Sequence, residues 1–175
     1  MPQTTIVKPD AAEYAAYYGR YVALVPDDAE ISHVLHRQLD ETLELLRGIP
    51  EARGDTRYAP GKWSIKEVIG HIADTERIFA YRALRFARGD TTPLPGFEQD
   101  GYVVNAQFDD CRLAELAAEF EYVRRATISL LAQLTPQAWQ RSGIASGNPV
   151  SVRALAYIIA GHELHHRNVL MSRYL

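Results

Sequence analysis

Three histidines are the residues whose types and spacing best suit metal chemistry. His162 and His166 are four positions apart, so both project from one side of a helix. That side also carries apolar residues, and His71 lies among the apolar residues of another segment. Burying an imidazole without a partner costs on the order of 1–3 kcal/mol, whereas one metal ion can accept electron pairs from three converging imidazoles. The sequence therefore predicts a metal site formed by His71, His162 and His166.

Other interpretations of these histidines are open. A single histidine on an apolar helix face more often forms hydrogen bonds in the core, and His165 could replace His166 as a ligand. Residues 162–166 also match the H-E-x-x-H pattern of zinc proteases, in which glutamate is the general base. That pattern needs a third ligand downstream, and no Glu or His follows His166. Glu163 would also point about 100° away from His162, so we do not expect a protease.

The other polar groups of these segments are expected to be structural. Asp74, Glu76 and Glu163 could orient ligand imidazoles through hydrogen bonds, but a plain surface position is the commoner outcome for a carboxylate. His33 and His36, three positions apart, are expected to be exposed. Solvated helix faces are the expected location of several arginines, namely Arg82, Arg85, Arg88, Arg124 and Arg125.

Four long segments with apolar residues at the helical period are expected to position the histidines. They cover residues 29–47, 65–88, 111–134 and 152–175, and the expected caps are Asp27-Asp28, Ser64 with Glu67, Asp109-Asp110 and Ser151. Thr135 and Pro136 predict a short helix that ends near Trp139. Residues 14–22 predict a short helical turn that packs tyrosines over one end of the bundle, and residues 141–149 a loop. Because no segment shows sustained strand alternation, the expected fold is all-α, a four-helix bundle.

A long connection between the second and third helices predicts the topology of the bundle. Residues 89–108 include Pro93, Pro95 and Gly96, whereas bundle connections usually take about 2–8 residues. About 20 extended residues can cross a helix roughly 36 Å long, so we expect an up-down-down-up bundle with the crossover here. The second and fourth helices are then antiparallel. At 1.5 Å per residue, His71 lies roughly 10 Å from one end of the bundle, and His162 and His166 lie roughly 15 and 9 Å from that same end.

Composition and charge exclude several classes of protein. The chain has 175 residues, 47% of them hydrophobic and 23% charged, as expected for one domain spanning residues 1–175. A net charge of −3 argues against nucleic acid or an anionic membrane as a partner. No apolar run approaches the roughly 18 residues of a membrane span, and residues 1–8 are too polar for a signal peptide. The single Cys111, expected to be a small buried residue, suits a reducing compartment. We therefore expect a cytoplasmic protein with a small-molecule substrate.

Several ordered motifs resemble the DinB-like, YfiT-type family. They are WSIKEVIGHIADTE at 63–76, PGFEQD at 95–100, SVR at 151–153 and GHELHHR at 161–167. The resemblance extends from about Tyr14 to the C-terminus. It implies an up-down-down-up four-helix bundle, often a homodimer, with a divalent metal ion such as nickel or zinc on three histidines. Carried over residue by residue, those ligands are His71, His162 and His166, with no departure from the family pattern.

The function that this resemblance implies is less specific than the ligand set. Many members are called metal-dependent hydrolases without a known substrate, and some relatives are S-transferases or isomerases that use mycothiol, bacillithiol or glutathione. A metal on three histidines suits both chemistries, because it can lower the pKa of bound water or bind a thiolate. A third hypothesis is a non-catalytic, stress-related dimer whose histidines only form hydrogen bonds. Residues 93–102 are expected to form one pocket wall, with Asp100 and Tyr102 as its polar groups; no catalytic residue is identified.

Overall fold

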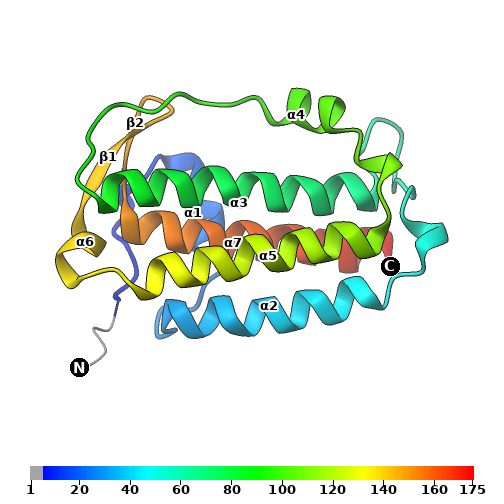
Figure 1. The fold of residues 1–175 in the computed structure, drawn as a ribbon, viewed down its shortest axis with the longest axis horizontal. Helices are drawn as coiled ribbons and strands as arrows, with labels where there is room; N and C mark the ends of the chain where they lie inside the picture. Colours follow the sequence, from blue (N-terminus) through cyan, green and yellow to red (C-terminus); the bar gives the residue numbers. More distant parts are fainter. Residues whose placement is uncertain (1–5) are drawn as a thin grey trace.

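Four long helices lie side by side in the described part of the chain, residues 6–175 of a computed structural model (Figure 1). They are α2 (Ile31–Arg47), α3 (Ile65–Ala87), α5 (Leu113–Ala132) and α7 (Val152–Val169). The shorter elements are α1 (Gly19–Val22), α4 (Gln99–Ala106), α6 (Pro136–Gln140), β1 (Ser142–Ala145) and β2 (Asn148–Ser151). Residues 1–5, on which part of the signal-peptide argument rests, lie outside the description. The expected four-helix bundle is confirmed.

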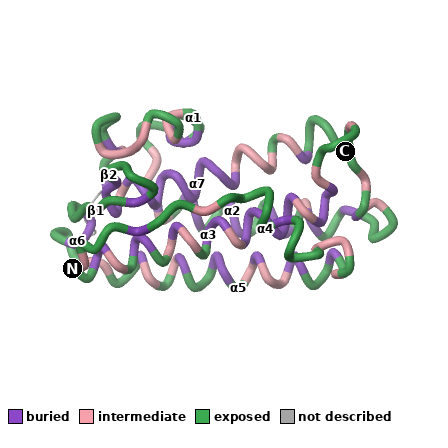
Figure 2. The backbone as a smooth tube through the Cα atoms, turned by 90° about the horizontal axis from the view of Figure 1, so that it is seen from above, coloured by how far each residue is buried: buried purple, intermediate pink, exposed green. Residues whose placement is uncertain are grey.

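The helices run in the expected directions. α2 and α7 point one way along the bundle, while α3 and α5 point the other way (Figure 1). The connection from α3 to α5 crosses the length of the bundle, and most of its residues are exposed (Figure 2). The up-down-down-up topology is therefore confirmed, and α3 and α7 pack against each other in antiparallel orientation. The connection also contains α4, a helix that the sequence analysis did not predict.

Two of the expected helix caps are wrong. Ser64 with Glu67 caps α3 in a capping box, and Ser151 caps α7, as predicted. The N-cap of α2, however, is Glu30, whose carboxylate accepts hydrogen bonds from the first turn, while Asp27 pairs with Lys8 instead. α5 begins after Arg112 rather than after the Asp109-Asp110 pair. Asp109 is used elsewhere, since it accepts a hydrogen bond from the Ser64 hydroxyl and joins the starts of α3 and α5.

The segment expected to be a loop at residues 141–149 contains a β-hairpin instead. β1 and β2 are antiparallel and are joined by Ser146 and Gly147, both at positive φ, which is typical of a two-residue hairpin turn. Each strand has only four residues, and neither Ser142–Ala145 nor Asn148–Ser151 shows a strict alternation of apolar and polar side chains. β1 also pairs with Leu94 of the crossing connection. The hairpin thereby fixes the connection to one end of the bundle.

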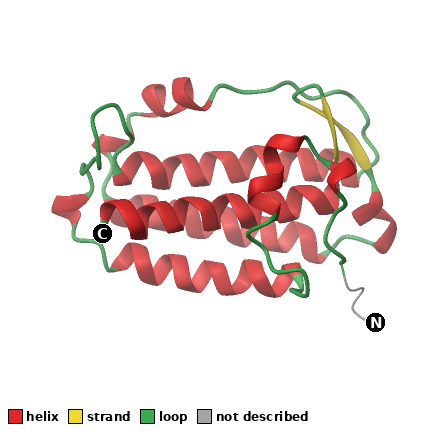
Figure 3. Cartoon of the chain, turned by 180° about the vertical axis from the view of Figure 1, so that it is seen from behind, coloured by secondary structure: helices red, strands yellow, loops and turns green. Residues whose placement is uncertain are grey.

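The aromatic N-terminal segment covers the side of the bundle. Its turn at Ala16–Tyr18 and α1 confirm the predicted short helical piece. It does not pack over an end of the bundle, because α1 lies across α7 (Figure 3). No helix within residues 6–175 combines the length and apolar character needed to cross a bilayer.

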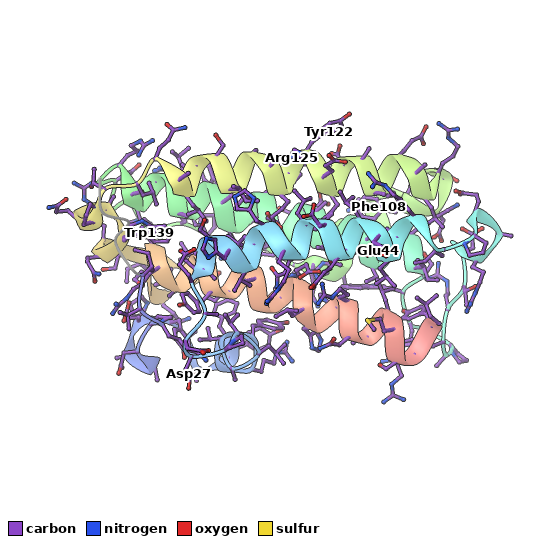
Figure 4. The ribbon with its side chains drawn as sticks, turned by 90° about the horizontal axis from the view of Figure 1, so that it is seen from below. Asp27, Glu44, Phe108, Tyr122, Arg125 and Trp139 are labelled. Carbon is purple, nitrogen blue, oxygen red and sulfur yellow. The ribbon has the colours of Figure 1, made fainter. Side chains whose placement is uncertain are left out.

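A charged group lies at the centre of the bundle, where the sequence predicted a solvated face. Arg124 of α5 is completely buried and forms a double ion pair with Glu76 of α3. It also donates a hydrogen bond to Gln38 of α2, whose amide in turn donates to the carbonyl oxygen of Ala160 in α7. Arg125, the next residue, is exposed as predicted and lies on the outer side of α5 (Figure 4). The prediction is therefore wrong for Arg124, which links all four long helices.

Candidate metal centre

Three imidazoles converge between α3 and α7. His71 projects from α3, and His162 and His166 project from successive turns of α7. One nitrogen atom from each ring lies within 4.8 Å of the corresponding atoms of the other two. The Nε2 atoms of His71 and His162 are 3.1 Å apart, and the three ring centroids are 4.5–5.0 Å from one another. The antiparallel packing of the two helices therefore brings three nitrogen donors into one small volume.

The environment of the three rings favours their neutral form. Burial lowers the pKa of His71 to about 4. Burial also lowers the pKa of His162 and His166 well below the ordinary value, and the neighbouring imidazoles and Arg20 lower them further. Neutral imidazole is the form that offers a lone pair to a metal ion. At neutral pH, all three rings can therefore act as ligands without first losing a proton.

One nitrogen atom of the cluster has no partner in the described chain. His166 as a whole is half-buried, but its Nε2 atom is enclosed and forms no hydrogen bond with any described residue. Leaving a buried polar atom unpaired costs on the order of 1–3 kcal/mol. A divalent ion would satisfy this atom together with the facing nitrogen atoms of His71 and His162. The donor set thus fits a metal that accepts imidazole nitrogen, such as zinc or nickel.

A threonine that the sequence analysis missed lies behind His71. Thr75 follows His71 by one helical turn of α3, and its Oγ1 atom is 3.3 Å from Nδ1 of the imidazole. If Nδ1–H donates to this hydroxyl, the lone pair of Nε2 faces the other two histidines. The i, i+4 spacing was visible in the sequence, so this contact could have been predicted.

A tyrosine from α1 covers the other side of the cluster. The ring of Tyr21 is 5.3 Å from that of His162, edge to face. This approach depends on Gly161, because a Cβ atom there would overlap the backbone carbonyl of Tyr21. The sequence shows no signal for this contact, since Tyr21 and Gly161 meet only in the folded chain.

A cavity of about 600 Å³ opens beside His162. Thr75 and Phe79 of α3 line it, together with three tyrosines of the N-terminal segment and residues 96–100 of the connection. The connection therefore forms a wall, as expected, and Asp100 faces the cavity. Tyr102 does not line it, because its ring packs on Phe97 and is about half exposed.

A second cavity, of about 340 Å³, lies beside His166. Trp63, whose ring is 4.6 Å from that of His71, lines this cavity together with His165. His165 is half-buried and does not belong to the converging group, so the geometry favours His166 as the third ligand. Asp100 borders both cavities. The histidine cluster can therefore be reached from two sides, with one carboxylate between them.

The predicted carboxylate orienters do not contact the imidazoles. Asp74 pairs with Arg77, and Glu76 pairs with Arg124. Glu163 is buried on the other side of α7, where it accepts a hydrogen bond from the Thr42 hydroxyl; burial raises its pKa. Glu76 and Glu163 are thus core residues, not surface carboxylates. Glu163 is also not placed to act as the base of a zinc protease.

The remaining residues singled out in the sequence differ in how far they are buried. His33, His36 and Arg88 are exposed, as expected, and Arg85 is half-buried in an ion pair with Asp90. Cys111 is half-buried instead of buried. The prediction of a solvated position is wrong for Arg82, which is 3% exposed.

Comparison with known proteins identifies a matching family and a relative of this chain. The model of the DinB superfamily matches residues 35–170. A protein of Oceanobacillus iheyensis, named "Putative metal-dependent hydrolase OB0413", is 30% identical over 112 residues. The match covers 62% of this chain and 63% of that relative, so the chain spans less than two thirds of its length.

Two solved structures share the fold at low sequence identity. YfiT from Bacillus subtilis, described as a probable metal-dependent hydrolase with an unusual four-helix bundle topology, superposes with a TM-score of 0.66. It is 16% identical, with 91% of this chain and 86% of that chain covered. A mycothiol-dependent maleylpyruvate isomerase also superposes with a TM-score of 0.66, at 14% identity, with 83% of this chain and 61% of that chain covered. At these identities, the likeness shows the fold alone.

Proposed function

The chain belongs to the DinB superfamily, and from this premise we propose that it is a metal-dependent hydrolase whose divalent ion is held by His71, His162 and His166. The observation that carries the proposal is the convergence of three neutral imidazoles, with donor atoms within 4.8 Å of one another. The unpartnered, enclosed Nε2 of His166 adds support, because hydrogen bonds among the described residues leave it unsatisfied. Zinc and nickel are the proposed ions.

The surrounding residues have distinct proposed roles. When bound, a divalent ion supplies Lewis-acid chemistry, since it lowers the pKa of a water or thiol at its open positions. Asp100, which borders both cavities, is the group we propose to accept or return a proton at its carboxylate. Tyr21 and Phe79 pack against His162 and restrict the access of bulk water from the larger cavity. The proposed substrate is a small molecule that enters this cavity.

A second candidate function is a metal-dependent transfer to or from a low-molecular-weight thiol. The two cavities beside the cluster favour it, because a reaction with two substrates needs two approaches to the same centre. The experiment that separates the two candidates is calorimetric titration of the metallated protein with mycothiol, bacillithiol and glutathione. Binding that requires the metal would support the transferase, and no binding of any of the three thiols would count against it.

The metal site is tested by elemental mass spectrometry of tag-free protein. We expect about one ion per chain in the wild type and none in the His162→Ala/His166→Ala variant. The His33→Ala/His36→Ala variant is the matched control, because it also loses two histidines, both of them exposed. Circular dichroism checks that each variant is folded. A wild type that stays metal-free after incubation with zinc, nickel and manganese would overturn the proposal and leave the histidines a structural role.

The proposed assembly is a cytoplasmic homodimer without a nucleic-acid or membrane partner. Tyr81, Leu84 and Tyr122 support a dimer contact, because they are exposed along one groove between α3 and α5. Sedimentation equilibrium of the wild type and of Tyr122→Glu tests this contact. A monomeric wild type would contradict it.

A further inference from the structure

The larger cavity, beside His162, is lined by an unusual number of aromatic rings. Five of its twelve lining residues are Tyr or Phe, whereas aromatic residues make up 10% of the chain. They come from the N-terminal segment, α3 and the connection, namely Tyr17, Tyr18, Tyr21, Phe79 and Phe97. Three segments that are distant in the sequence thus bring aromatic side chains to one space next to the histidine cluster.

Four of these rings form a network that reaches His162. The ring of Phe79 is nearly perpendicular to that of Tyr18, with centroids 5.8 Å apart, and to that of His162, with centroids 6.2 Å apart. Tyr21 also meets the His162 ring edge to face, at 5.3 Å, and Tyr17 meets Tyr18 and Tyr21 in the same way. Such pairs are favourable, because the positive edge of one ring points at the negative face of the other.

The contacts between the rings leave part of their aromatic surface uncovered. Tyr17 is 56% exposed, and Tyr18 and Phe97 are half-buried. Among the described rings, Phe97 packs only on Tyr102, so it is a separate part of the cavity wall. A volume of about 600 Å³ and a largely aromatic wall are typical of a pocket for a small molecule. The uncovered surface therefore indicates a site for an apolar part of a ligand.

Cations of the chain do not explain every ring of this wall. Arg20 lies over two of the tyrosines, and Arg82 lies near both phenylalanines. Neither guanidinium lines the cavity. Within residues 6–175, Tyr18 is the one ring of the five that has no cation over its face. The position of Tyr18 is thus best explained by the cavity that it lines.

We propose that the larger cavity binds an aromatic ring of the substrate against Tyr18 and Phe97. This inference rests on the proposed metal-dependent function and narrows its substrate to small molecules that carry an aromatic ring close to the reacting group. The wall presents both faces and edges of rings, and an aromatic guest gains contacts there that an aliphatic group of the same size lacks. Because Phe79 links Tyr18 to His162, the guest ring lies within a short distance of the metal centre.

Hydroxamates, which bind a metal ion, provide a direct test. The probes are phenyl hydroxamates in which the ring is attached directly or through a short alkyl chain, each paired with the cyclohexyl compound of the same length. Isothermal titration calorimetry of zinc-loaded protein gives the ratio of the phenyl affinity to the cyclohexyl affinity. The cyclohexyl ring fills a similar space but has no π face, so a change of this ratio between proteins reports on contacts between aromatic rings.

The matched variants locate the effect. Tyr18→Leu and Phe97→Leu each keep an apolar side chain but remove one ring from the wall. In each, the ratio should fall by a factor on the order of three to ten at one preferred chain length. Tyr122→Leu removes an exposed ring of α5 that does not line the cavity, and it should keep the wild-type ratio. Both ligands are compared on the same protein, so a loss of stability or of zinc affinity alone does not change their ratio.

The outcomes separate this inference from the proposed function. A ratio that stays at the wild-type value in Tyr18→Leu and Phe97→Leu at every length would overturn the aromatic site and leave the metal site standing. A fall of the same size in Tyr122→Leu would also overturn it, because the effect would not belong to the cavity. A wild type that holds no zinc would overturn the proposed function and this inference together. If Tyr18 only packs the N-terminal segment on the bundle, Tyr18→Leu lowers the thermal stability and the ligand ratio stays unchanged.

Discussion

Two buried polar clusters lie on different sides of α7 and differ in how their polar groups are balanced. One contains Arg124 and Glu76, an ion pair in which three guanidinium hydrogen bonds reach the carboxylate. The other contains His71, His162 and His166, whose ring nitrogen atoms converge and leave the Nε2 atom of His166 without a partner in the described chain. The first cluster is closed by groups of the chain itself. The second lies beside two cavities, and the ligand that would complete it is the proposed metal ion.

The closed cluster connects the helices that carry the histidines of the open cluster. Arg124 and Glu76 join α5 to α3, and Gln38 of α2 extends the network from Arg124 to the backbone of α7. Hydrogen-bonded groups at fixed positions resist sliding of one helix along another. The relative position of α3 and α7 determines whether His71 lies level with His162. We therefore infer that the closed cluster sets the register on which the open cluster depends.

The largest effect is expected from breaking the closed cluster. Arg124→Met leaves Glu76 as a buried carboxylate without its counter-charge, which should lower the free energy of unfolding by about 3–5 kcal/mol. Equilibrium unfolding in urea measures the change. Because the register of α3 and α7 is also disturbed, the variant should bind zinc more weakly than the wild type.

Two variants control for the loss of the side chain itself. Arg125→Met changes the neighbouring exposed residue and should alter stability by less than about 0.5 kcal/mol. Arg124→Met/Glu76→Leu removes the whole pair, so it should recover part of the stability lost in the single variant. An Arg124→Met protein as stable as Arg125→Met would show that the ion pair contributes nothing.

The four long helices could be predicted because their signals are local. Ser64 and Glu67 are three residues apart, and the capping box follows from that spacing alone. The length of the connection at 89–108 predicts the parallel arrangement of α3 and α5 without any knowledge of packing. The distance of His71 and of the two α7 histidines from the end of the bundle could also be calculated, because the rise per residue of a helix is constant. These inferences need no contact between distant residues.

The closed cluster could not be predicted, because its burial depends on distant partners. Arg124 does fall on the helical period of the buried residues Phe120 and Leu131, but a charged residue there is buried only with partners, and these are Glu76, 48 positions earlier, and Gln38. Asp109 likewise has the sequence context of a helix cap, but in the folded chain its carboxylate accepts a hydrogen bond from Ser64, 45 positions away. The contact between Tyr21 and Gly161 has the same origin. Charge and spacing predict which residues are polar, but not which of them find a partner in the core.

Zinc should raise the free energy of unfolding by binding to the open cluster, and the closed cluster should not contribute to this gain. At a free zinc concentration of 100 times the dissociation constant, wild-type protein should gain about 2.7 kcal/mol of stability. His71→Ala should lose this gain while remaining folded, because Arg124 and Glu76 still join α3 to α5. Urea unfolding with and without zinc measures both quantities. An equal gain in wild type and variant would remove His71 from the site.

Acid should distinguish the metal-free histidines from the rest of the core. His71 has its pKa lowered to about 4 in the folded state, so the unfolded chain binds a proton at higher pH than the folded one. This contribution to stability is fully present above about pH 6.5 and is lost as the pH falls towards 4. Between these values, His71→Gln should show a shallower decline than wild type, by up to about 1.4 kcal/mol per pH unit.

The control for the acid experiment is His33→Gln, which removes an exposed histidine of α2. Chelator-treated samples unfolded in urea at several pH values give the slopes. We expect the His33→Gln slope to match wild type, and a His71→Gln slope equal to both would contradict the neutral, buried state of His71.

The smallest effect is expected from the threonine behind His71. Thr75→Val keeps the shape of the side chain but removes the hydroxyl 3.3 Å from Nδ1, so the imidazole loses a contact that holds its orientation. Zinc affinity should fall by about tenfold, measured by competition with a chromophoric chelator. Thr127→Val is the matched control, because its hydroxyl is equally buried but donates to the Val123 carbonyl oxygen on α5. If the two variants lose the same affinity, the effect belongs to the packing of the core, and the hydroxyl of Thr75 does not orient His71.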